Sequence, residues 1–112
     1  MPTAAAQRGV PTVLQSAATS GNGTAIALPP NMREHRITIN GSVGVASGAV
    51  QPESADDPAY AGTWQAIGSP VTIVANAELA VAFTGIFQFV RARISTLVVG
   101  GTVTVSHVGQ ST

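Results

Sequence analysis

The sequence predicts an all-β fold, a single-domain antiparallel β-sandwich or jelly roll. Its 112 residues are enough for one hydrophobic core. Several short stretches alternate between apolar and polar residues, which is the period of a strand, and 12 Gly and 7 Pro punctuate the chain. No long helical pattern lies between these stretches, so we expect antiparallel strands rather than the helix-connected strands of a parallel sheet.

The N-terminal region predicts an extended arm followed by a hairpin. Residues 1–9 show neither a helical nor a strand period, so we expect an arm there and the β-sandwich domain in residues 10–112. Strands predicted over residues 12–19 and 24–28 flank the Gly-Asn-Gly sequence at 21–23, which is a strong turn signal. We expect this pair to form the first hairpin.

The middle of the sequence predicts one well-marked strand and one long loop. Residues 36–45 alternate most clearly, so we expect a half-buried strand there. Its apolar face comprises Ile37, Ile39, Val43 and Val45. Residues 47–62 contain two prolines and three acidic side chains, and we predict that they form the longest loop.

Two short strands are predicted next, over residues 63–67 and 71–74, on either side of a Gly-Ser-Pro break. Residues 75–82 contain alanines, Glu78 and Leu79, which favour a helical turn. The stretch is short and flanked by β-branched residues, so we predict a strand in preference to that turn.

The C-terminal region predicts a strand and a closing hairpin. Residues 87–95 alternate, with Val90, Ala92 and Ile94 on one face and two arginines and a serine on the other. The segments 97–99 and 101–106 flank a Gly-Gly pair, so we expect them to form a hairpin.

Charge and cysteine content exclude several classes of function. Five basic and five acidic residues give a net charge of zero, and the arginines are scattered, so we expect no nucleic-acid binding. Only 9% of residues are charged, a surface composition that favours association with other proteins. The absence of cysteine excludes disulfides, thiolate metal sites and cysteine nucleophiles. We expect neither a secretory signal nor a membrane span, and therefore a protein made and kept in the cytoplasm.

The histidines do not predict a catalytic or metal site. His35 lies between Glu34 and Arg36, and we interpret it as part of a solvent-facing strand entry rather than a proton-shuttling pair. His107 has no carboxylate pattern near it in the sequence, so no metal is expected there. With no Gly-x-Ser-x-Gly motif either, we expect no enzyme activity and no cofactor.

The acidic residues Glu53, Asp56 and Asp57 lack the ligand spacing of a calcium loop, so we expect a solvated loop.

Two other groups, a pair of aromatic residues and a pair of arginines, leave alternatives open. Tyr60 and Trp64 suit stacking on a sugar, although Trp64 is more readily explained as core filling.

Arg91 and Arg93 share one face of a predicted strand. Their guanidinium groups are suited to pairing with carboxylates of a neighbouring subunit, or to keeping that sheet face hydrated. The sequence does not separate these two interpretations.

The order of three segments resembles that of small tailed-phage virion proteins. These segments are 63–67 (TWQAI), 89–95 (FVRARIS) and 101–105 (GTVTV), and the N-terminal 14–17 (LQSA) and 21–25 (GNGTA) are similar to the opening of that family. The resemblance implies a β-sandwich or jelly-roll component of a virion, most simply a capsid decoration (cement) protein assembled in the host cytoplasm.

Its implied partners are the major capsid protein and copies of itself, as a homotrimer. We expect the arm, with Arg8, to lie across a capsid subunit, and Arg91 and Arg93 to contact neighbouring copies. Two alternatives remain open: a carbohydrate-binding module acting through Tyr60 and Trp64, and a tail or head-to-tail connector component.

Overall fold

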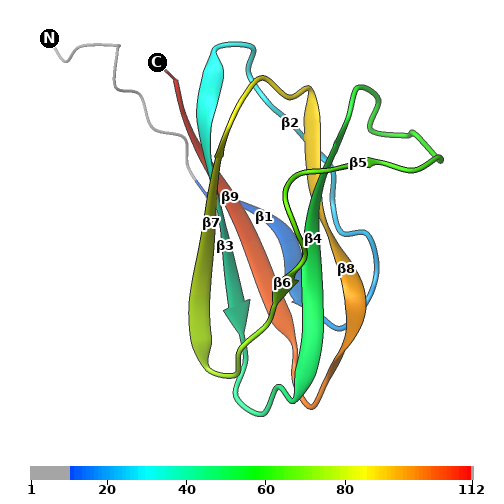
Figure 1. The fold of residues 1–112 in the computed structure, drawn as a ribbon, viewed down its shortest axis with the longest axis vertical. Coiled ribbons are helices and arrows are strands. Elements are labelled where there is room, and N and C mark those ends of the chain that lie inside the picture. Colours follow the sequence, from blue (N-terminus) through cyan, green and yellow to red (C-terminus); the bar gives the residue numbers. More distant parts are fainter. Residues whose placement is uncertain (1–10, 112) are drawn as a thin grey trace, which may run out of the picture.

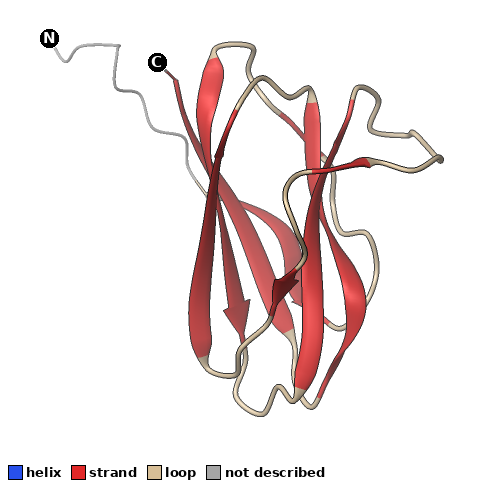
Figure 2. Cartoon of the chain, viewed as in Figure 1, coloured by secondary structure: helices blue, strands red, loops and turns tan. Residues whose placement is uncertain are grey.

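The computed structural model describes residues 11–111, which form nine strands in two antiparallel sheets packed face to face (Figures 1 and 2). The predicted all-β sandwich is confirmed. The predicted arm and Arg8 lie outside the described residues. No helix in residues 11–111 is long and apolar enough to cross a membrane.

Each sheet has long strands at its centre. Sheet 1 has the order β1-β9-β3-β7 and comprises β1 (Thr12–Ala18), β9 (Val103–Ser111), β3 (Met32–Gly41) and β7 (Ala77–Thr84). Sheet 2 has the order β2-β8-β4-β5 and comprises β2 (Ile26–Ala27), β8 (Phe89–Val99), β4 (Ser47–Ala55) and β5 (Gln65–Ala66), with β6 (Val71–Thr72) also paired to β4.

The core lies between the sheets and consists of small aliphatic side chains. Alternate residues of the long strands point inward, as the sequence predicts for β3 and β8. The largest fully buried aliphatic members are Leu14, Ile37, Ile39, Val50, Val90, Val103 and Val105. Burying each such side chain contributes about 1.5–3 kcal/mol, and Phe83 of β7 packs against this aliphatic core.

Neither predicted hairpin forms. β1 pairs with β9 and β2 pairs with β8, so the Gly-Asn-Gly turn carries the chain from one sheet to the other. β8 and β9 likewise belong to different sheets and are joined across Gly100. A positive φ at Gly21, Gly23 and Gly100 lets the chain reverse direction. The turn conformation does not determine which strand the next segment pairs with. That pairing is determined by burial of the apolar faces of the strands.

The prediction of a loop over residues 47–62 is wrong for its first part, because β4 occupies Ser47–Ala55 at the centre of sheet 2. Pro52 is tolerated within this strand. Its carbonyl accepts a hydrogen bond from the Ile67 N–H at 2.9 Å, so the side of its backbone that lacks a donor faces β5 and not β8.

The remaining predictions differ in their boundaries. The strand predicted over residues 36–45 begins earlier and ends at Gly41, and Val43 is 76% exposed rather than buried. The segment 75–82 contains most of β7, so the strand interpretation is confirmed over the helical turn. The strands predicted at 63–67 and 71–74 are reduced to two residues each, β5 and β6.

Candidate functional site

A buried carboxylate joins two arginines on the outer face of sheet 2. Glu53, on β4, is only 4% exposed. Its Oε1 accepts a hydrogen bond from Nε of Arg91 at 3.0 Å and lies 3.0 Å from Nη2 of the same guanidinium in an ion pair. Its Oε2 accepts a hydrogen bond from Nε of Arg93 at 2.8 Å. The register places Glu53 directly opposite Arg91 on β8. The prediction that Glu53 belongs to a solvated loop is therefore wrong, whereas Asp56 and Asp57 are exposed as predicted.

Trp64 completes this cluster by packing against Arg91. The Arg91 guanidinium carbon lies 4.2 Å from the centre of the indole ring, in cation–π contact. The indole Nε1 donates a hydrogen bond to the Tyr60 carbonyl at 2.9 Å. Trp64 is buried, as its core-filling interpretation predicts, but it lies apart from the main core cluster. Its ring has no free face for a sugar, so the predicted sugar contact does not fit Trp64, while Tyr60 is exposed.

The two arginines differ in what they leave exposed. The side chain of Arg91 is 14% exposed and that of Arg93 is 39% exposed. Both are paired within the chain through Glu53, a partner about forty residues away that the sequence does not indicate. Contact with a neighbouring subunit stays a prediction for both, and Arg93 is the side chain with more surface to offer.

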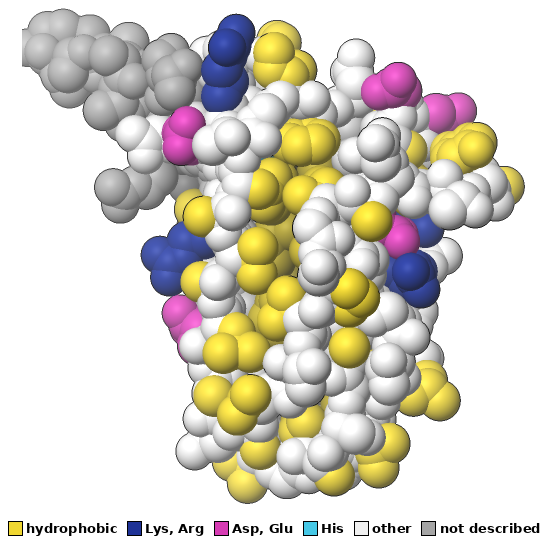
Figure 3. Space-filling model, in the orientation of Figure 1, with side chains coloured by type: hydrophobic (Ala, Val, Ile, Leu, Met, Phe, Trp, Pro, Cys, Tyr) yellow, Lys and Arg dark blue, Asp and Glu magenta, His cyan; other side chains and the backbone are white. Residues whose placement is uncertain are grey.

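One end of the sandwich presents exposed apolar side chains. We call it the apolar end, defined by Val43, Val74, Leu97 and Val99. Backbone hydrogen bonds hold its loops together: Asn76 N–H to the Ser42 carbonyl at 3.1 Å, and Ala46 N–H to the Val99 carbonyl at 2.7 Å. Figure 3 shows apolar side chains gathered at the lower end of the molecule, where these loops lie in Figure 1.

Two histidines form a buried pair inside the other end. Nδ1 of His35 lies 3.0 Å from Nε2 of His107, and Nε2 of His35 lies 2.9 Å from the Gly85 carbonyl. The carbonyl can only accept, so Nε2 of His35 donates to it, and in the neutral form of this ring Nδ1 accepts a hydrogen bond from Nε2 of His107. The prediction that His35 faces solvent is wrong. The signal was present, because His35 shares the odd-numbered face of Ile37 and Ile39.

Aromatic rings pack against His35, and burial favours the neutral form of His107. Phe83 stacks on His35 at 5.0 Å between ring centres, and Phe87 meets His35 edge-on at 5.4 Å. Burial, and secondarily repulsion from His35, lowers the pKa of His107 to about 4. Within residues 11–111 no group of three or more His, Asp or Glu side chains is placed to hold a metal ion. The geometry is that of a structural pair.

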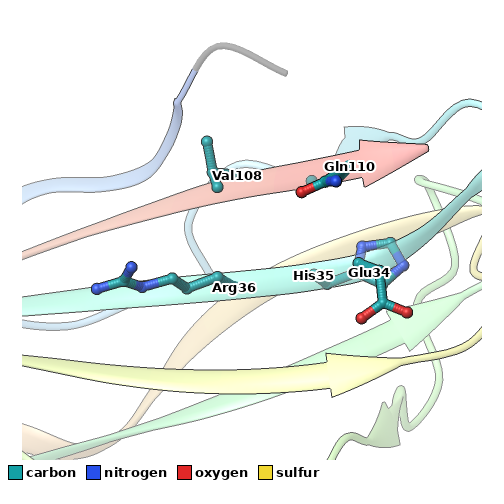
Figure 4. A pocket seen from close by; sticks show the side chains of 6 residues that line it. Glu34, His35, Arg36, Val108 and Gln110 are labelled. Atoms are coloured by element: carbon teal, nitrogen blue, oxygen red, sulfur yellow. The ribbon is translucent and has the colours of Figure 1, made fainter. Parts of the chain in front are cut away.

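A shallow hollow of about 300 Å³ lies where β3 and β9 run side by side. Figure 4 shows Glu34 and Arg36 on β3 next to Val108 and Gln110 on β9. The lining brings together a carboxylate, a guanidinium and an amide, but no nucleophile with an adjacent base.

The two packed sheets place this protein in the class of antiparallel β-sandwiches. No family model and no curated protein matches the sequence. The chain is similar in structure to SPBc2 prophage-derived protein YomS, whose crystal structure it matches with a TM-score of 0.67 over 99% of each chain. The sequence identity is 20%, so this likeness shows a shared fold.

Proposed function

We propose that this protein is a structural component of a phage virion that binds the outside of the capsid and stabilises the head. The observation that carries the proposal is the likeness to a prophage-derived protein over essentially the whole of both chains. The order of the TWQAI, FVRARIS and GTVTV segments supports the same conclusion independently of the structure.

The apolar end is the surface we assign to the capsid. The three segments that form it, 42–46, 73–76 and 96–102, contain no charged residue. The centres of protein interfaces are likewise depleted of charge. The valine side chains there lose little conformational entropy on binding, because branching at Cβ already restricts them.

Binding of this kind stabilises both partners. A shell that binds only the folded domain raises its apparent stability by mass action. Because the net charge is zero, long-range electrostatic attraction contributes little to the encounter. The partner surface that fits is therefore apolar, and the affinity should change little with salt concentration.

Immunogold labelling of phage particles tests the role. Antibodies raised against the purified protein are applied to particles from the strain that carries the gene. Label over the heads supports decoration, and label confined to the tail or neck replaces it with the connector alternative. Particles that carry no label contradict any virion role.

A pelleting assay with phage heads stripped of the protein tests the surface. Val43→Asp places a charge on the apolar end, and we expect at least about a tenfold loss of binding, since a buried unpaired charge is costly. Ile86→Asp is the matched control, because Ile86 is an exposed apolar residue outside the apolar end. Equal binding by both variants would exclude the apolar end as the contact.

A further inference from the structure

β7 is an edge strand whose second side is open. It is the last strand of sheet 1 and pairs with β3 alone, in unbroken register from Ala77 opposite Gly41 to Thr84 opposite Glu34. Beyond the β3 ladder, no backbone hydrogen bond among residues 11–111 ends on β7. Its outer N–H and C=O groups therefore form a template for another strand.

The other sheet edges are protected and β7 is not. β1, at the opposite edge of sheet 1, has two register irregularities and a positive φ at Ala17. The edge strands of sheet 2, β2, β5 and β6, have two residues each. β7 has eight residues, no proline, no irregularity and one charged residue, Glu78. Long regular edges of this kind pair readily with other strands.

The side chains of β7 are also compatible with a partner. Its inward face, Leu79, Val81 and Phe83, is only partly covered, and Leu79 and Phe83 pack against the core. Figure 3 shows apolar side chains in a band down the middle of the molecule, beside β7. Its outward face has small residues, Ala80 and Ala82, which leave room for long side chains from a neighbouring strand.

We propose that β7 pairs with β7 of a second copy, antiparallel, about a twofold axis through Ala80. Opposite residues in an antiparallel pair point to the same face, so only registers that pair even with even positions keep the apolar face inward. Registers that pair at least five residues of β7 and include Glu78 among them place the twofold axis through Leu79, Ala80 or Val81. Charge decides among these three.

With the axis through Ala80, Glu78 lies opposite Ala82 of the second copy. Ala82 is in turn flanked on β3 by Arg36 of the same copy. Two strand spacings separate Glu78 from that Arg36, about 10 Å between Cα atoms, which their long side chains can span across the small alanine. The symmetry makes this contact twice.

The other two registers lack this match. With the axis through Val81, Glu78 lies opposite Thr84 of the second copy, which is flanked by Glu34, so that like charges approach. With the axis through Leu79, the corresponding neighbour is the neutral Thr38. Within residues 11–111 neither Glu78 nor Arg36 has an ion-pair partner, so both are available to the second copy.

This inference does not depend on the proposed virion role. It yields a twofold dimer, in place of the homotrimer expected from the family resemblance. It also leaves most of the apolar end free, since residues 42–46 and 96–102 lie outside β7 and only the segment 73–76 adjoins that strand. Failure of self-association and failure of capsid binding are therefore separate results.

Thiol cross-linking tests the register, because the protein contains no cysteine. Ala80→Cys places two thiols opposite each other across the axis, within reach of a disulfide or a short bis-maleimide. Ala82→Cys is the matched control, since its thiols lie four residues apart along the strands. We expect a cross-linked dimer from Ala80→Cys alone. Cross-linking by Ala82→Cys instead, or by neither variant, overturns the proposal.

Charge exchange tests the contact by sedimentation equilibrium. Glu78→Arg and Arg36→Glu should each weaken the dimer about tenfold, because each replaces attraction by repulsion. The double variant restores opposite charges and should regain wild-type affinity. Both side chains are exposed, so folding is unaffected. A monomeric wild type, or a double variant as weak as the single ones, overturns the proposal.

Discussion

Acid should destabilise this protein through His107. Its folded-state pKa is lowered to about 4, from an ordinary value of 6.5, by burial and by His35. Above pH 6.5 the histidine is neutral in both the folded and the unfolded chain and the stabilisation is complete. Between pH 6.5 and 4 the unfolded chain binds the proton more tightly, so the free energy of unfolding falls with falling pH. The full loss is about 3 kcal/mol.

Urea unfolding followed by the fluorescence of the single tryptophan measures this loss. The wild type and His107→Gln are compared at pH 7 and pH 4. Glutamine keeps a hydrogen-bond donor towards His35 but does not titrate. The carboxylates titrate in both proteins, so the extra loss in the wild type, about 3 kcal/mol, belongs to His107. An equal loss in both proteins would refute the role assigned to burial of this histidine.

Other variants probe the ion-pair cluster and the strand connections. Glu53→Gln should lower the free energy of unfolding by about 3 kcal/mol, because it removes the charge shared by two arginines at a buried position. Arg93→Gln should lower it by only about 1 kcal/mol, since that side chain is more exposed. Urea titration at pH 7 compares the two variants, and equal losses would contradict the burial assigned to Glu53. Gly100→Ala should lower the thermal midpoint at least twice as far as Gly68→Ala. Both glycines have positive φ, but of the two only Gly100 lies where an added Cβ would clash with another segment, at the Gly44 carbonyl. Similar shifts would count against that close approach.

Where one face of a strand is buried, the sequence predicted the structure well. The alternation around Ile37 and Ile39 identified β3, and that around Val90 and Ala92 identified β8, because the period of a strand is written directly in consecutive residues. The same alternation places His35 on the inward face with Ile37, but the charged neighbours Glu34 and Arg36 led to the prediction that it faces solvent.

What the sequence concealed was pairing between distant segments. β4 reads as a loop because proline and glutamate are rare in central strands. Glu53 is accommodated only by Arg91 and Arg93, about forty positions further along. The two hairpin predictions were wrong for the same reason. Turn residues indicate that the chain reverses direction, but they do not indicate which strand the next segment pairs with.

The position of β9 has a consequence for synthesis. It lies between β1 and β3, and it is the last of the described strands to leave the ribosome. Until it emerges, β1 has no hydrogen-bonded neighbour in its sheet and one side of β3 is unpaired. Co-translational folding of this sheet is therefore incomplete, and the nascent chain closes its two layers only after Val103–Ser111 is released.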